Sequence, residues 1–303
     1  MKISYGKLRV PLQRVVKRGD GDHDVLACEV SIEVLGENFA AAYVEGDNSA
    51  VVATDTMKNF ILRESLAYRG DTLEGLLEHL GRGFLATYPV MEAVRMTGRE
   101  HRFDRLSGKL FAREPGSDHA VAMIELGEDG IRDHRSGRED MRLLKVTGSS
   151  FTRFARDEYT TLPERVDRPL LIRMDVHWRY GDPGADHVDP WAVREHVAAT
   201  FDDFVSESIQ HLVHEMGLRM LDSWPQLAEV SFDAENHTRD PAGDDGARRI
   251  YTDPFPAQGL ITLTLERECG AGSPRTCSTP RADGPRAASG SSWRASTATP
   301  ARR

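Results

Sequence analysis

The clearest helix in this sequence covers residues 71–88, DTLEGLLEHLGRGFLATY. Its apolar side chains recur at helical spacing along one face: Leu73, Leu76, Leu77, Leu80, Phe84, Leu85 and Tyr88. Pro89 cannot continue a helix and ends this one. A helix with one apolar face must cover another layer, and the segments around it predict that this layer is a sheet.

Strands are predicted on both sides of this helix. Residues 24–35 alternate between apolar and polar side chains, and the turn residues at 18–22 predict a hairpin with an earlier strand. A second helix is predicted over about residues 54–67, with Thr54 or Asp55 as its N-cap. The other predicted strands of this half are residues 7–12, 90–97, 101–111 and 120–126.

The same order of elements recurs in the second half. Its predicted strands and helices are residues 140–147, 170–180, 190–205 (helix), 208–223 (helix), 227–232 and 259–267. The repeat predicts an α+β fold of two units, 1–135 and 136–268, each an antiparallel sheet with helices on one face. Residues 269–303 are dominated by Ser, Pro, Ala, Gly, Thr and Arg, which predicts a disordered tail.

The composition excludes several classes of protein. The net charge is -9 over 303 residues, which argues against a nucleic-acid partner but not against a small anion held by one local arginine. No segment approaches the roughly 20 apolar residues of a membrane span, and no signal peptide is predicted. The three cysteines form no CxxC pair, which is typical of a reduced, cytoplasmic setting.

Phe151 and Arg168 are the first candidates for a ligand site. The ring could stack on the face of a flat polar heterocycle, and the guanidinium could donate two parallel hydrogen bonds to its edge. An enzyme acting on a purine-like molecule needs both contacts. The alternatives are a core phenylalanine and a surface arginine paired to Asp167 or Glu164.

Four segments, taken in order, resemble the urate oxidase (uricase) family. They are residues 5–7, 46–59, 144–168 and 206–210. One short motif would be weak, whereas four with family-like spacing are specific, and the resemblance extends from Tyr5 to about Arg267. It implies a tandem T-fold and a homotetramer that forms a barrel-like tunnel, with active sites between subunits. Ring closure would also hide the edges of the predicted sheets.

The resemblance implies an activity as well. Enzymes of this family oxidise urate with O₂ to 5-hydroxyisourate and hydrogen peroxide, and they use no metal and no organic cofactor. His211 and His214 have the i,i+3 spacing of a metal pair, but no third ligand follows in pattern, so no metal site is predicted.

The resemblance also implies a proton relay of Lys7, Thr54 and His237. A lysine with the usual pKa of about 10.4 is protonated at pH 7, so burial would have to lower the pKa of Lys7 for it to act as a base. The Thr54 hydroxyl would pass the proton and contact O₂ or water. Asp55 would contact the ligand through its backbone. The structural alternatives are a solvated lysine and a helix N-cap.

On the substrate side, the resemblance implies that Phe151 stacks on urate and Arg168 holds one edge. Gln210 would bond the opposite edge through its amide, and Ile209 would contribute its backbone N–H.

The relay pattern of the family is Asn-x-His, and this sequence departs from it. Glu235 stands two residues before His237, and Asn236 stands directly before it. Either Asn236 makes the oxygen contact, or that contact is altered.

The sequence leaves two other functions open. One is a T-fold enzyme acting on a related pterin or purine with zinc or a reactive cysteine, which the mid-strand position of Cys28 disfavours. The other is a urate-binding protein that has lost catalysis, for which Glu235 is the reason.

Overall fold

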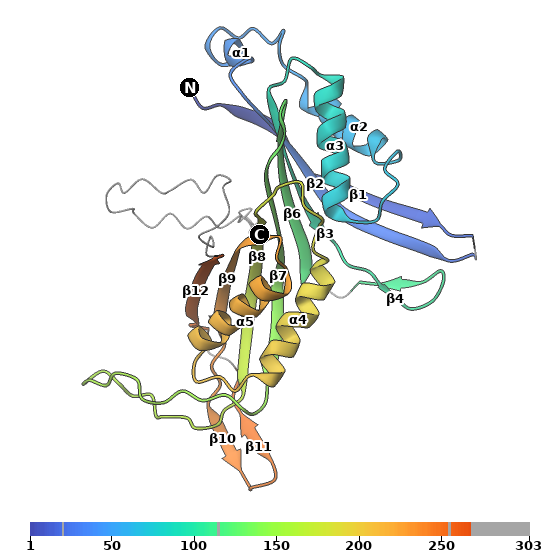
Figure 1. Ribbon diagram of the computed structural model, residues 1–303. Coiled ribbons are helices and arrows are strands. Elements are labelled where there is room, and N and C mark those ends of the chain that lie inside the picture. Colours follow the sequence, from blue (N-terminus) through green and yellow to red (C-terminus); the bar gives the residue numbers. More distant parts are fainter. Residues whose placement is uncertain (20, 114–115, 254–255, 268–303) are drawn as a thin grey trace, which may run out of the picture. The chain divides into compact units, whose positions relative to one another are not determined.

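An eight-stranded antiparallel sheet dominates the computed structural model, which describes residues 1–267 except 20, 114–115 and 254–255 (Figure 1). In spatial order its strands are β1 (Ser4–Lys17), β2 (His23–Leu35), β3 (Ala93–Glu100), β6 (His119–Gly127), β7 (Gly130–Lys145), β8 (Leu170–Tyr180), β9 (Leu227–Asn236) and β12 (Gly259–Glu266). The predicted tail at 269–303 lies outside the described residues.

Two small hairpins stand apart from this sheet. One pairs β4 (Asp104–Arg105) with β5 (Phe111–Ala112), and the other pairs β10 (Pro241–Asp244) with β11 (Arg249–Tyr251). The single strand predicted over residues 101–111 is therefore wrong, because the chain turns back at Ser107, whose hydroxyl accepts hydrogen bonds from the N–H groups of Lys109 and Leu110.

Five helices accompany the strands in the described part of the chain: α1 (Ala40–Val44), α2 (Thr54–Glu64), α3 (Leu73–Thr87), α4 (Pro190–Asp203) and α5 (Ile209–Ser223). Side chains of Thr72, Asp189 and Ser208 cap α3, α4 and α5. The predicted cap of α2 is wrong, because Ala53 occupies the N-cap position and Thr54 is the first helical residue.

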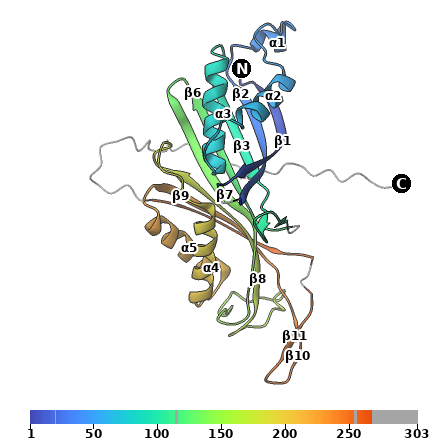
Figure 2. The same cartoon turned by 90° about the vertical axis from the view of Figure 1, so that its right-hand side faces the viewer.

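The register of the sheet puts its apolar side chains on one face. Ile32, Met96 and Ile124 are partners in one cross-strand row and are fully buried. Trp178 and Val230 form a similar row further along. Helices α2 and α3 cover this face over the first four strands, and α4 and α5 cover it over the last four (Figures 1 and 2).

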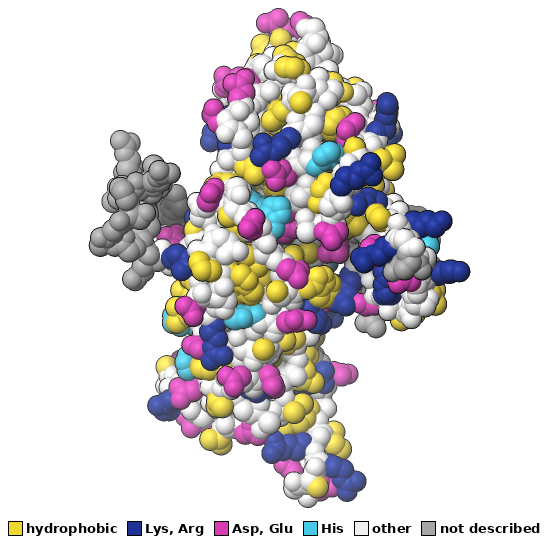
Figure 3. Space-filling view, turned by 45° about the vertical axis from the view of Figure 1, so that its right-hand side comes forward, with side chains coloured by type: hydrophobic (Ala, Val, Ile, Leu, Met, Phe, Trp, Pro, Cys, Tyr) yellow, Lys and Arg dark blue, Asp and Glu magenta, His cyan; other side chains and the backbone are white. Residues whose placement is uncertain are grey.

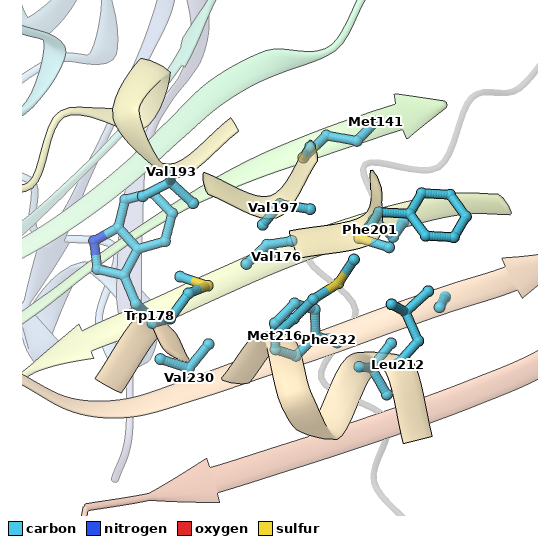
Figure 4. Packing of buried hydrophobic residues seen from close by; sticks show 14 of the residues in the cluster. Met141, Val176, Trp178, Val193, Val197, Phe201, Leu212, Met216, Val230 and Phe232 are labelled. Carbon is cyan, nitrogen blue, oxygen red and sulfur yellow. The ribbon is translucent and has the colours of Figure 1, made fainter. Parts of the chain in front are cut away.

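Two clusters of buried side chains form the core. The first lies under α2 and α3, and the second lies under α4 and α5. In the second, Trp178 and Phe232 of the sheet pack against helix residues such as Val197 and Met216 (Figure 4). Burying one such side chain contributes about 1.5–3 kcal/mol. The predicted division at residue 135 falls inside β7, which pairs with both neighbours, and it stays a prediction.

The opposite face of the sheet is polar. Arg95 lies between Glu33 and Glu125 in one cross-strand row, at 2.9 and 2.8 Å. On the molecular surface drawn in Figure 3, acidic, basic and apolar side chains are interspersed. The face drawn in Figure 3 therefore carries no extended basic surface.

A buried carboxyl group, Glu74 of α3, links the helix layer to the sheet. It is 2% exposed, and the Ser136 hydroxyl of β7 donates a hydrogen bond to it at 3.0 Å. Burial raises the pKa of Glu74 from 4.5 to about 7, and the negative charges of Glu100 and Asp189 contribute. The folded protein therefore holds this proton at pH values where the unfolded chain has released it.

This difference predicts a loss of stability with rising pH. Between about pH 4.5 and 7 the unfolded chain ionises first, so the free energy of unfolding should fall by up to about 3 kcal/mol and then level off. Glu74→Gln should remove this slope. Denaturant unfolding at pH 5 and pH 8 measures it, with Glu78→Gln, one turn along α3, as the control. Equal pH dependence in wild type and Glu74→Gln would contradict the prediction.

Candidate active site

A pocket of about 120 Å³ opens where the second half of the sheet meets the start of α5. Five residues expected to bind the ligand lie together in its lining: Phe151, Arg168, Ile209, Gln210 and Asn236. Leu162, Thr238 and Ile261 complete the lining.

Backbone hydrogen bonds hold the loop that carries Phe151 and Arg168. The N–H of Phe151 donates to the Arg165 carbonyl at 2.7 Å, and Arg165 returns a bond at 3.0 Å. The N–H of Arg168 donates to the Ser149 carbonyl at 2.9 Å. These bonds close the loop on itself and leave the Arg168 guanidinium 5.4 Å from the centroid of the Phe151 ring.

The two acids expected as alternative partners of Arg168 are engaged elsewhere. The Asp167 carboxylate accepts hydrogen bonds from Thr147 and Gly148, and the Glu164 carboxylate accepts one from the Arg153 N–H at 2.8 Å. The reading of Arg168 as a paired surface residue is therefore wrong.

The Arg168 guanidinium is a partly buried cation without a counter-charge. Its Nε is buried without a hydrogen-bond partner, and no ion pair joins it to any residue in the described part of the chain. Burial lowers the pKa of Arg168, and the charge of Arg165 lowers it further. A partly buried cation of this kind costs stability unless an anion neutralises it, so a negatively charged ligand would be favoured beside it.

The start of α5 adds a second attraction for anions. Ser208 caps the helix by accepting a hydrogen bond from the His211 N–H at 3.1 Å. The N–H groups of Ile209 and Gln210 belong to the first turn, where no intrahelical acceptor exists. The positive end of the helix dipole and these N–H groups therefore face the pocket.

The end of β9 presents alternate residues to two faces. Asn236 lines the pocket, and so does Thr238, two residues on. The His237 ring between them accepts a hydrogen bond at Nδ1 from the Gln258 amide at 3.3 Å, and its Nε2 lies 3.7 Å from the Glu235 carboxylate. His237, which was expected in the relay, is not part of the pocket lining.

Glu235 also lies away from the pocket. Its register partner across the sheet is Arg173, which donates a hydrogen bond to the carboxylate at 3.3 Å on the polar face. The reason for suspecting an inactive binding protein was a carboxylate in the oxygen site, and this arrangement removes that reason.

Lys7, Thr54 and Asp55 form a separate group in the first half of the chain. The Val52 N–H donates to the Tyr5 hydroxyl at 2.9 Å and thereby holds the start of α2 over β1. Asp55 is hydrogen-bonded to Lys58, which lowers its pKa most, and Lys7 lies close enough to lower that pKa further. None of the three lines the pocket of the same chain.

A β-bulge follows Lys7 directly. The register of β1 against β2 shifts between Lys7 and Val10, and Arg9 has a φ of 53°, which is a strained conformation for a residue with a side chain. Bulges are common beside functional sites, where they redirect a side chain, and this one follows directly after Lys7 on the edge strand.

Three pocket residues had no predicted role: Leu162, Thr238 and Ile261. Leu162 belonged to the segment that carried the resemblance. Thr238 could have been found from strand parity, because it is two residues beyond Asn236. Ile261 comes from β12, whose pairing with β9 is a long-range feature that no local pattern reveals.

The remaining candidates contribute little to a site. Cys28 is 1% exposed, and burial raises the pKa of its thiol to about 12, so it is not a reactive thiolate. The described residues contain no group of three or more His, Cys, Asp or Glu side chains placed to hold a metal ion. Within the same residues, no helix is long and apolar enough to cross a membrane.

Known proteins are similar to this chain in sequence and in fold. The uricase family model matches residues 3–129 and 134–243. A uricase of Haloferax volcanii is 41% identical over 273 residues, covering 82% of this chain and 89% of that protein. The uric acid degradation bifunctional protein of Bacillus subtilis is 35% identical over 271 residues, and this chain spans about half (55%) of its length.

A solved structure agrees with the sequence relatives. The crystal structure of uricase from Arthrobacter globiformis superimposes with a TM-score of 0.81 at 28% identity, covering 91% of this chain and 96% of that one. The α+β architecture with one large antiparallel sheet and few helices is common to both. The chain belongs to the uricase family.

Proposed function

We propose that this protein oxidises urate with O₂ to 5-hydroxyisourate and hydrogen peroxide. The single observation that carries the proposal is the unpaired, partly buried guanidinium of Arg168 beside the Phe151 ring at the positive end of α5. A planar purine anion matches all three features: a ring face to stack, an edge for the guanidinium fork and a charge for the helix.

The reaction balances without an added reagent. Urate, O₂ and water give 5-hydroxyisourate and hydrogen peroxide. Two electrons leave the purine ring and reduce O₂ to peroxide, and water supplies the new hydroxyl group. Deprotonated urate is electron-rich enough to be the reductant, so we propose that neither a metal nor an organic cofactor takes part.

In this proposal the two groups of residues have different tasks. Phe151, Arg168 and Gln210 hold urate, which supplies orientation before reaction. Lys7, coupled to Thr54, removes a proton from the bound anion and later returns it. The backbone N–H groups at Ile209 and Asp55 add fixed dipoles around the developing charge.

The two groups must come from different chains. Lys7 lies on β1, one edge of the sheet, and Ile261 of the pocket lies on β12, the other edge. A second copy whose β1 lies beside β12 of the first brings Lys7 to the pocket, and two such contacts close the sheets into a ring and leave no free edge. We therefore propose tandem T-fold units, a tunnel built by such rings and a homotetramer.

A urate assay tests the function. Purified protein should remove the ultraviolet absorbance of urate while consuming O₂ and releasing one hydrogen peroxide per urate, with the same rate after chelator treatment. Tight binding of urate without turnover would support a binding protein instead. Loss of activity with chelator and recovery with zinc would support a metal-dependent T-fold enzyme.

A further inference from the structure

We infer that Thr238, rather than His237, is the third member of the proton relay, next to Asn236 in the pocket. The inference rests on the proposed function and concerns the same site. It assigns a role to Thr238, a side chain that a comparison with the Asn-x-His pattern does not consider.

Strand parity places the side chains of Asn236 and Thr238 on the same side of the chain. Asn236 is the last residue of β9, and side chains two residues apart in an extended chain point to the same side. The N–H of His237 donates to the Leu171 carbonyl at 3.0 Å, so pairing with β8 continues through this residue and fixes its direction. Asn236 and Thr238 both line the pocket, as this parity requires.

The side chains that contact the His237 ring lie outside the pocket lining. Its Nδ1 accepts a hydrogen bond from the Gln258 amide at 3.3 Å, whereas its Nε2 lies 3.7 Å from the Glu235 carboxylate and has no hydrogen-bond partner among the described residues. Because Nδ1 accepts from the amide, Nε2 carries the proton and faces that carboxylate. Glu235 is in turn bonded to Arg173 on the polar face. The ring therefore lies on the side of the sheet away from the helices, beside Glu235 and outside the pocket lining.

The hydroxyl of Thr238 has the chemistry that the third group of the proton relay needs. A hydroxyl both donates and accepts, so its oxygen can receive a proton from bound urate or water while its own proton passes toward Lys7. Threonine is unchanged at the end of such a step, and the proton resides on the Lys7 amine. A histidine with a pKa near 6.5 would change charge within the working pH range, whereas a threonine hydroxyl would not.

The test compares Thr238→Val, Thr238→Ser and His237→Gln in the urate assay. Thr238→Val keeps the shape and removes the hydroxyl, so kcat should fall by about 100-fold, as for loss of an acid–base group, with KM nearly unchanged. Thr238→Ser should restore most of that loss. His237→Gln should stay within about threefold of wild type and leave the pH profile of kcat unchanged, because its ring is not part of the pocket lining.

Either of two results overturns the inference: full activity in Thr238→Val, or a large loss with an altered pH profile in His237→Gln. If Thr238→Val does not fold, as judged by thermal unfolding, the His237→Gln result decides alone. Wild-type protein is assayed first, and failure of the wild type to oxidise urate would contradict the proposed function instead.

Discussion

Lys7→Met should lower kcat for urate by about 100- to 10,000-fold, which is the usual contribution of a positioned acid–base group. Methionine retains the length and the apolar stem of lysine but cannot accept a proton. Binding of a non-reactive urate analogue should be nearly unchanged, because the holding groups Phe151, Arg168 and Gln210 lie in a different part of the chain. Steady-state kinetics and analogue titration measure the two effects separately.

A matched control lies on the same strand. Lys17 is exposed at the far end of β1, so Lys17→Met removes an equal charge from the same element without approaching α2. It should leave kcat and stability unchanged. Retention of activity in Lys7→Met, or an equal loss in Lys17→Met, would show that Lys7 is not the base.

Much of the fold was predictable because burial on one face leaves a periodic signal. The strand predicted over residues 170–180 has the observed bounds of β8, and the apolar face of residues 71–88 predicted α3 within two residues. The first half of β7 was missed because its inward side chains are polar. His134, Ser136 and Arg138 are buried there, and Ser136 and Arg138 bond to the long-range partners Glu74 and Asp118. A pattern based on hydrophobicity cannot detect a strand of that kind.

The site, like the fold, was predictable from the sequence only in part. Phe151, Arg168, Gln210 and Asn236 were predicted to share a ligand, and they lie together in one pocket. Thr238 was missed because the segment was compared with a motif before the parity of its strand was known. The proposed relation of Lys7 to the pocket depends on a second copy of the chain, and contacts between copies leave no periodic trace in a single sequence.

Arg168→Ala should mainly weaken binding. The guanidinium is the pocket's own unpaired cation, and a hydrogen bond to a charged group contributes roughly 1.5–3 kcal/mol, so KM should rise about 10- to 100-fold. Arg168→Lys should fall between, because it keeps the charge and loses the two-pronged geometry. Arg165→Ala is the control, since its side chain does not line the pocket. Unchanged KM in Arg168→Ala would contradict the assignment.

A second measurement on the same variant separates a ligand clamp from a structural residue. Without ligand, the buried charge of Arg168 has no ion-pair partner among the described residues, so Arg168→Ala should melt at the same temperature as wild type or higher. A urate analogue should then raise the melting temperature of wild type much more than that of the variant. A variant that is strongly destabilised without ligand would mean that Arg168 supports the fold. A residue selected for holding an anion should lower the stability of the empty protein and restore that stability when the anion binds.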